Sequence, residues 1–253
     1  MALADAAPRL GRFGEAIEYF PTVGSTNDVA IHRATSRDHE YRVIIADAQT
    51  SGRGRRGRTW FSPPGAGLYV SAILVPARAS DAGRAMQLTT IAAGVALVEG
   101  VAAATGLMPH LKWPNDLYVG RRKLAGILAE GTGGAVVLGY GVNVSAASFP
   151  PDLADRVTSI ESELGRTVDR PRVLAETLSA LAVRYADLLA GRFDAILDAW
   201  RARAPGCRGA RVSWTTPAGA QTGVTAGIDE LGALLVRAGD RTERIVAGEL
   251  TWL

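Results

Sequence analysis

The chain has 253 residues, of which 47% are hydrophobic and 21% are charged, so it has ordinary globular composition and enough length to bury a core. Its formal net charge is +3, and without the four arginines between Arg53 and Arg58 it would be −1. This local charge argues against the broad basic face of a typical nucleic-acid-binding protein. Cys207 is the single cysteine, which excludes an intrachain disulfide and a cysteine metal cluster and suits a reducing compartment.

Helix-like and strand-like patterns alternate over the first 200 residues. The segment GSTNDVAIHRA predicts a helix that Ser25 or Thr26 caps, with Asp28 in its first turn. Further helices are predicted over residues 86–104, 172–190 and 193–200, and strands over residues 43–46, 67–75, 111–113, 117–119, 124–130 and 135–144.

The sequence offers no clear membrane segment. The N-terminal residues have no continuous apolar run of the signal-peptide kind. The nearest candidate for a spanning helix, TTIAAGVALVEGVAAATG, contains Glu99 and is interpreted as a buried helix. We therefore expect a cytoplasmic protein without membrane attachment.

The pattern changes near Pro205–Gly206. From Arg211 onward the sequence predicts short strands in RVSWTT, GVTAGID, ALLVRA and RIVAGEL, separated by turn sequences such as PAGAQ and DELG. A tail of roughly 45 residues is too small to be stable without leaning on its neighbour. We therefore predict one domain over residues 1–205 and a second over residues 206–253.

The segment SGRGRRGRTWFSP, residues 51–63, concentrates arginine on a glycine-rich backbone. Glycine allows a main chain to approach a ligand closely, and successive N–H groups of such a loop can bind an anion. Arginine adds paired hydrogen bonds to a carboxylate or phosphate. A solvated basic loop or an RNA-binding arginine–glycine tract would have the same composition, so the segment alone leaves these alternatives open.

Two further segments place polar side chains among apolar strands. In LKWPNDLYVGRRKLAGILAE, a turn at Pro114 sets Asp116 near strand ends, and Lys123 precedes a strand that begins with small residues, among them Gly126. A plain hairpin turn and a surface lysine would account for either residue alone. In GYGVNV, Asn143 stands in an apolar strand, where its amide needs a partner.

These segments, together with GSTND, GLYVSAIL and GIDELGALLV, resemble biotin protein ligases in order and spacing from Val23 onward. The resemblance implies an α+β fold: a mixed sheet with flanking helices on one side, of the class II synthetase-like (biotin/lipoate ligase) type, plus a small C-terminal SH3-like β-barrel. It implies ATP-dependent activation of biotin to biotinyl-5′-AMP. Transfer would follow, to a lysine of a biotin carboxyl carrier domain of acetyl-CoA carboxylase or a related carboxylase.

The resemblance also implies the site residues. The catalytic set is Lys123, Arg53, Arg55 and Asp116. The expected biotin-binding residues are Ser25, Thr26, Asn27, Gln49, Arg53, Gly54, Arg55, Lys123 and Gly126. The expected ATP- or adenylate-binding residues are Arg55, Trp60, Asn115, Lys123 and Asn143.

The implied reaction brings two anions together, since the carboxylate of biotin must attack the α-phosphate of ATP. Arg53, Arg55 and Lys123 are suited to neutralise that charge. Mg²⁺ is expected with the ATP, held mostly through phosphates. Asp116 is the candidate either to hold this metal or to orient the acceptor lysine, and the sequence does not choose between these roles.

Two other functions stay open at this point. One is a lipoate or octanoate ligase or transferase of the same superfamily, and the other is an RNA-binding module with an arginine–glycine tract. Many bacterial biotin ligases carry an N-terminal winged-helix domain that binds DNA, but only 24 residues precede Ser25 here. We therefore expect no specific DNA binding. The sequence does not give the oligomeric state and leaves a homodimer open.

Overall fold

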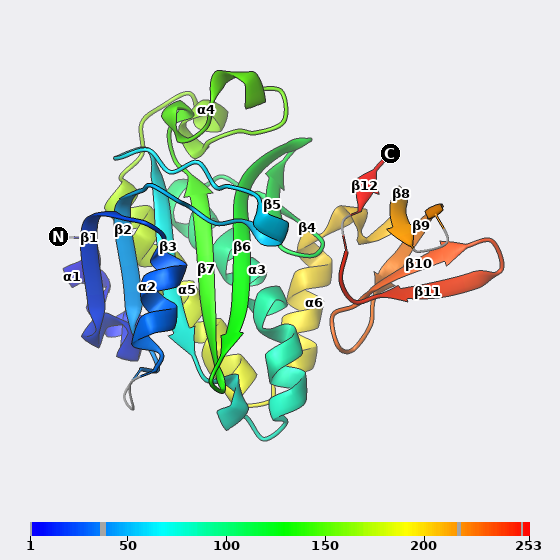
Figure 1. Cartoon of the computed structure of the whole chain (residues 1–253), viewed down its shortest axis with the longest axis horizontal. Coiled ribbons are helices and arrows are strands. Elements are labelled where there is room, and N and C mark those ends of the chain that lie inside the picture. The colour runs from blue at the N-terminus through cyan, green and yellow to red at the C-terminus, as the bar shows by residue number, and fades with distance from the viewer. Residues whose placement is uncertain (1, 36–38, 217–218, 249) are drawn as a thin grey trace.

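The computed structural model describes residues 2–35, 39–216, 219–248 and 250–253, which form two β-sheets with helices around the larger one (Figure 1). The larger sheet has seven strands in the order β1-β2-β3-β7-β6-β5-β4. Strands β1 and β2 are parallel and the other neighbouring pairs are antiparallel, so the sheet is mixed, as predicted. Its strands are β1 Ile17–Val23, β2 Val43–Gln49, β3 Gly67–Leu74, β4 His110–Lys112, β5 Asp116–Val119, β6 Arg122–Thr132 and β7 Ala135–Asn143.

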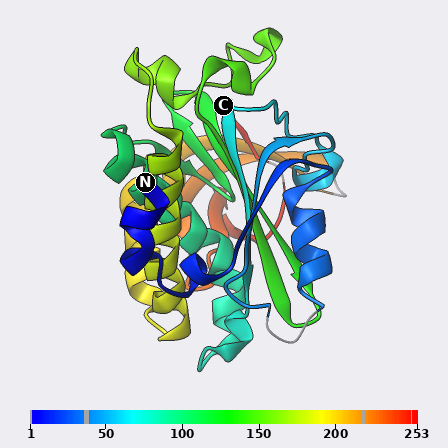
Figure 2. The ribbon, with the colours of Figure 1, turned by 90° about the vertical axis from the view of Figure 1, so that its left-hand side faces the viewer.

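The helices lie on both faces of this sheet, and not on one side as the family resemblance implied. Figure 2 shows α2 on one face and α1, α3, α5 and α6 on the other. The α-helices are α1 Ala2–Leu10, α2 Thr26–Arg33, α3 Ala82–Thr105, α4 Ile160–Leu164, α5 Arg170–Leu189 and α6 Phe193–Arg203.

The two faces explain why the central strands are apolar at nearly every position. Successive side chains of a strand point to opposite faces of a sheet. In β2, Val43 and Ile45 join the core beneath α3 and α5, while Ile44 joins a smaller core beneath α2. In β7, Leu138 joins the large core and Val137 the small one. Both faces are therefore buried, and the strands show no polar alternation.

Helix α3 contains the apolar segment that the sequence analysis interpreted as a buried helix. Among the described residues it is the one helix long and apolar enough to cross a membrane by length and composition. However, 67% of its apolar window is buried inside the protein. The packing of α3 against the sheet, α5 and α6 agrees with its interpretation as a core helix.

The smaller sheet is antiparallel, with the strand order β11-β10-β9-β8-β12, as expected for a small C-terminal barrel. A short 3₁₀ turn, Pro205–Cys207, joins it to α6, and the domain division at residues 205 and 206 stays a prediction. The turn between β9 and β10 contacts the first domain, since Trp113 Nε1 donates a hydrogen bond of 2.9 Å to Gly232 O. Its strands are β8 Arg208–Thr216, β9 Gly219–Ile228, β10 Leu234–Ala238, β11 Arg241–Ile245 and β12 Thr251–Trp252.

Several elements differ from the sequence prediction. The edge strand β1 and helices α1 and α4 were not predicted. The strand predicted in RIVAGEL is wrong beyond Ile245, because β11 ends there and described residues 246–248 are not in a strand. Position 249 of that segment lies outside the described residues.

Candidate active site

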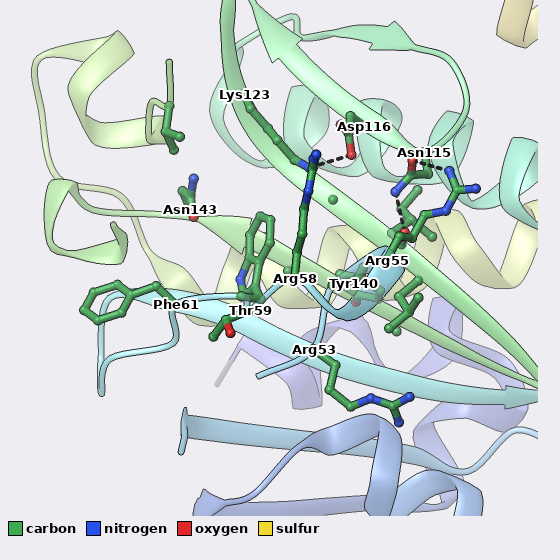
Figure 3. A pocket seen from close by; sticks show the side chains of 18 of the residues that line it. Arg53, Arg55, Arg58, Thr59, Phe61, Asn115, Asp116, Lys123, Tyr140 and Asn143 are labelled. Carbon is green, nitrogen blue, oxygen red and sulfur yellow. Dashed lines mark hydrogen bonds and ion pairs between the residues drawn. The ribbon is translucent and has the colours of Figure 1, made fainter. Parts of the chain in front are cut away.

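A cavity of about 540 Å³ lies where the amino end of α2, the arginine–glycine loop, the β4–β5 hairpin and strands β6 and β7 meet. Gly248 and Leu250 from the C-terminal region also line it. Figure 3 shows part of this wall, with Lys123, Asp116, Asn115 and Arg55 grouped around the hairpin. The structure brings every site residue predicted from the sequence to this one cavity: Ser25, Thr26, Asn27, Gln49, Arg53, Gly54, Arg55, Trp60, Asn115, Asp116, Lys123, Gly126 and Asn143.

The inner end of the cavity is polar and buried. Gln49 Oε1 accepts hydrogen bonds from Thr26 N at 2.8 Å and from Thr26 Oγ1 at 3.1 Å. Gln49 Nε2 donates to Ser62 Oγ at 2.8 Å, so both ends of this amide are oriented. Ser25 occupies the N-cap position of α2, as predicted, but its side chain forms no capping hydrogen bond. Such a set of fixed hydroxyl and amide groups suits a ligand with an amide-like polar end.

Asn27 links the polar end of the cavity to Glu130, which also pairs with Arg53. Its Nδ2 donates to Glu130 Oε2 at 2.8 Å, and its Oδ1 accepts from Ser71 Oγ at 2.6 Å. The side chain lies directly on Gly139, where an added Cβ would be 2.0 Å from Asn27 Oδ1. Ser71 and Glu130 were not predicted as site residues. No local motif marks them, because they support Asn27 from distant strands.

Arg53 points away from the hairpin in Figure 3. Its guanidinium forms ion pairs of 2.5 Å with Asp28 Oδ1 and with Glu130 Oε1. Burial opposes the charge of Arg53, but the two carboxylates outweigh burial and raise its pKa above the ordinary value. In this structure Arg53 therefore fixes the base of its loop against α2 and β6.

The opposite end of the cavity holds a cluster of charges. Lys123 Nζ lies 2.7 Å from Asp116 Oδ1. Arg55 Nη1 donates to Asn115 Oδ1 at 2.9 Å, and burial lowers the pKa of Arg55 although the charge of Asp116 acts in the other direction. Figure 3 shows Arg58 extending toward the Lys123–Asp116 pair. This partly desolvated positive corner is a place where an anionic ligand gains more than it would in water.

The floor between the two ends has no side chains. Gly126 of β6 and Gly141 of β7 are paired across the sheet, and the indole of Trp60 lies over both. Lys123 Nζ is 5.5 Å from the centroid of the Trp60 ring. The indole that covers the two glycines offers an apolar ring face against which a ligand ring or chain can pack.

The predicted residue Asn143 and two residues that the sequence analysis did not single out also line the cavity. Asn143 lines the wall as predicted, and its Nδ2 donates to Thr158 O at 3.0 Å. Lys112 and Tyr118 of the β4–β5 hairpin line the cavity as well. The signal that would have found Lys112 is the rarity of lysine, which occurs twice in the chain.

The described residues contain no group of three or more His, Cys, Asp and Glu side chains that could hold a metal by themselves. Asp116 is the carboxylate at the positive corner, and its Oδ1 is already the ion-pair partner of Lys123. One protein carboxylate is enough for Mg²⁺ where phosphate oxygens supply most of the ligands. The donor set therefore fits a metal that arrives with a phosphate ligand.

Comparisons with known proteins give a consistent result. A family model described as the biotin/lipoate A/B protein ligase family matches residues 19–145. The bifunctional ligase/repressor BirA of Bacillus subtilis is 33% identical over 244 residues, covering 94% of this chain and 74% of the relative. The biotin–[acetyl-CoA-carboxylase] ligase of Mycobacterium tuberculosis is 35% identical over 236 residues, covering 91% of this chain and 86% of the relative.

A solved structure with the same architecture is the biotin protein ligase of Aquifex aeolicus in complex with biotin and ATP. It superimposes with a TM-score of 0.81 at 27% identity, covering 94% of this chain and 99% of that chain. The biotin protein ligase of Leishmania major in complex with biotinyl-5-AMP has the same fold, with a TM-score of 0.65 at 21% identity.

Proposed function

The chain belongs to the biotin/lipoate A/B protein ligase family, and we propose that it is a biotin–protein ligase. It activates biotin with ATP to biotinyl-5′-AMP and transfers the biotinyl group to a lysine of a biotin carboxyl carrier protein or domain. The observation that carries this proposal is the position of the Lys123–Asp116 pair and Arg55 at one end of a cavity whose other end is polar and buried. Biotin is itself a molecule with a ureido ring at one end and a carboxylate at the other.

The two ends of the cavity suit the two ends of biotin. Thr26, Asn27 and Gln49 offer donors and acceptors of the kind that a ureido group requires. The carboxylate of biotin then extends toward Lys123 and Arg55 past the indole of Trp60, which covers the two glycines of the floor. Trp60 and Asn143 lie on the same wall and are the candidates to contact the adenylate.

In the first step an oxygen of the biotin carboxylate attacks the α-phosphorus of ATP, and pyrophosphate leaves. Both reactants are anions, so fixed positive groups that already face the meeting point lower the barrier. One well-placed donor of this kind is worth on the order of 3 kcal/mol. Lys123 and Arg55 are held in place by Asp116 and Asn115, so little reorganisation is needed when the charges meet.

In the second step the amine of the carrier lysine attacks the carbonyl carbon, and AMP leaves with the electrons of the C–O bond. The arginine–glycine loop lies over the cavity and reduces the access of water, which would hydrolyse the mixed anhydride. Mg²⁺ bound through ATP phosphates would supply further charge neutralisation, with Asp116 as its protein ligand. Alternatively Asp116 orients the carrier amine.

The other expectations about partners stay proposals. They are a cytoplasmic location, no specific DNA binding, no membrane attachment, and assembly as a homodimer. The local positive charge of the chain supports the expectation about DNA, because four arginines of one loop account for the net positive charge.

The test is to incubate the purified protein with biotin, MgATP and a biotin carboxyl carrier domain. The carrier should gain the mass of one biotinyl group at one lysine. A parallel reaction with lipoate in place of biotin distinguishes the two ligase classes of the family. A carrier that gains lipoyl but no biotinyl group would overturn the proposal.

A further inference from the structure

Lysine is almost absent from this chain. Of its 28 lysine and arginine residues, only Lys112 and Lys123 are lysines. Both line the cavity described above. Everywhere else the chain carries its positive charge on arginine.

The distinction between the two cations matters for the proposed chemistry. Biotinyl-5′-AMP is a mixed anhydride that acylates primary amines. A guanidinium stays protonated and delocalised at all physiological pH values, whereas a lysine side chain becomes a nucleophile whenever it loses its proton. Apart from the terminal amine, the 253-residue chain therefore offers the intermediate two acceptors.

Lys112 lies near the faces of two aromatic rings. Lys112 Nζ lies 4.6 Å from the centroid of the Tyr118 ring and 5.6 Å from that of the Trp252 ring. It also lies 3.5 Å from Tyr118 Oη. The face of an aromatic ring attracts a cation, so the two rings hold the ammonium group and limit its movement.

Through Lys112, the ring pair joins the cavity-lining hairpin of the larger sheet to the smaller sheet. Lys112 of β4 and Tyr118 of β5 belong to the same hairpin, and Asp116 is the register partner of Lys112. Trp252 comes from β12 of the smaller sheet, where it pairs with Val212. Its ring lies against Gly206, where a Cβ would be 2.5 Å from Trp252 Cζ3. The position of Trp252 is therefore fixed by its pairing with β8 and by its contact with the 3₁₀ turn at Gly206.

We propose that Lys112 is the internal self-biotinylation site of this ligase, and that Tyr118 and Trp252 slow its reaction with biotinyl-5′-AMP. The arginine side chains of the rest of the chain do not react with the intermediate. The inference rests on the proposed function for its acyl donor. In the reaction, the deprotonated Nζ of Lys112 attacks the carbonyl carbon of biotinyl-5′-AMP. A C–N bond forms, the C–O bond to the phosphate breaks, AMP leaves with the electron pair, and the nitrogen loses a proton to water.

The first experiment removes one ring face. Trp252→Leu keeps an apolar side chain but no ring, and Trp252→Phe is the matched control that keeps a ring. Each protein is incubated with biotin and MgATP without a carrier, and biotinylated peptides are quantified by mass spectrometry. Trp252→Leu should label Lys112 about fivefold faster than Trp252→Phe and wild type. Addition of Lys112→Arg to Trp252→Leu should abolish that label.

A second experiment leaves the ring pair intact and adds an amine. Arg58→Lys places it at the cavity wall, and the control Arg241→Lys places it on the exposed edge strand β11. Arg58→Lys should become labelled at the new lysine about tenfold faster than Arg241→Lys, since the intermediate forms beside position 58. An N-hydroxysuccinimide ester of biotin, applied to both variants, shows that each new amine is accessible.

Carrier labelling in the same tubes separates the two proposals. A protein that labels no carrier contradicts the proposed function, and chemically made biotinyl-5′-AMP added directly then still tests Lys112. If the carrier is labelled but Lys112 of Trp252→Leu reacts with the ester and not with the intermediate, Lys112 is not the self-biotinylation site. Equal labelling of the new lysines in Arg58→Lys and Arg241→Lys would show that distance from the cavity does not affect biotinylation of a lysine, and would contradict the proposal.

Discussion

Gly141 and Trp60 are in such close contact that a Cβ on Gly141 would lie 2.4 Å from the indole nitrogen Nε1. Gly141 stands in the middle of β7, where its backbone is extended and needs no glycine for conformational reasons. The missing side chain is therefore a requirement of the site. It leaves room for the ring that covers the floor of the cavity.

Gly141→Ala should displace Trp60 and weaken adenylate formation more than it weakens the fold. An added methyl group in a packed site costs about 1–3 kcal/mol, and here the group that must move is the ring of Trp60. Calorimetric titration with ATP in the absence of biotin, so that no reaction follows, measures the loss of ATP affinity. Gly131→Ala on β6 is the control, because no atom lies within 4 Å of its added Cβ. Equal ATP affinity in both variants would contradict the role given to Trp60.

Lys123→Ala should keep the fold and lose most of the adenylation activity. The ammonium of Lys123 matters most when carboxylate and phosphate meet, so its removal should reduce the rate of pyrophosphate release by about 10²- to 10³-fold. Lys123→Arg should recover little, since a planar guanidinium does not replace a compact ammonium beside Asp116. A normal rate of pyrophosphate release in Lys123→Ala would remove Lys123 from the mechanism.

Arg55→Gly should release the intermediate. The variant loses a charge-assisted contact worth about 1.5–3 kcal/mol, so biotinyl-5′-AMP should escape one to two orders of magnitude faster. Labelling of an unrelated lysine-rich protein by the variant, biotin and MgATP measures this escape. Arg56→Gly is the control on the same loop, because Arg56 is exposed and has a φ of 58°, which glycine adopts readily. Unchanged bystander labelling by Arg55→Gly would show that the loop does not retain the adenylate.

The arginine–glycine loop should become more ordered when ligand binds. The two sides of the loop are joined by an isolated β-bridge between Arg53 and Thr59 and by a hydrogen bond of 2.7 Å from Gly54 N to Arg58 O. Most side chains of the loop are exposed. The charge of Arg56 acts against the charge of Arg55, and an anion bound beside them would offset that repulsion. Hydrogen exchange of residues 51–61 should therefore slow when biotin and ATP are added. Equal protection with and without ligands would contradict this view.

Asp229→Asn should destabilise the protein at neutral pH and much less in acid. Asp229 Oδ1 accepts hydrogen bonds of 2.9 Å from Leu231 N and Ala233 N, and Oδ2 pairs with Arg244. Burial acts against the charge, but Arg244 and the two amides outweigh burial and lower the pKa of Asp229. A carboxylate whose pKa is lowered in the folded state stabilises fully above its unfolded-state pKa of about 3.9, and this contribution is lost as the pH falls through the folded-state pKa.

The expected cost of Asp229→Asn at pH 7 is about 1–2 kcal/mol in the free energy of unfolding, measured by urea denaturation. The difference from wild type should shrink as the pH falls below about 4. Asp240→Asn, in the exposed turn between β10 and β11, is the matched control. A difference from wild type that is independent of pH would show that the charge of Asp229 is not what stabilises this turn.

The sequence by itself determined most of the buried helices and strands and the polar composition of the loops between them. Buried strands such as 135–144 are apolar on both faces, and helix 172–190 has a regular apolar spacing, so local patterns were sufficient for them. Arg55, Asn115 and Lys123 were identified as candidate site residues through the resemblance to biotin protein ligases, because a basic loop, a plain turn or a surface lysine has the same local composition. Strand β1 could not be found from local patterns, because it is an exposed edge strand that contains Pro21 and has no continuous apolar run.

Only the tertiary structure decided how these residues are used. It directs Arg53 outward to Asp28 and Glu130, directs Arg55 inward to Asn115, and places Trp252 against Lys112 from 140 positions further along the chain. Arg53 and Arg55 have the same side chain but different roles, because each lies within reach of different partners. Those partners lie on strands and helices whose separation in sequence says nothing of their separation in space, so no local pattern could assign them.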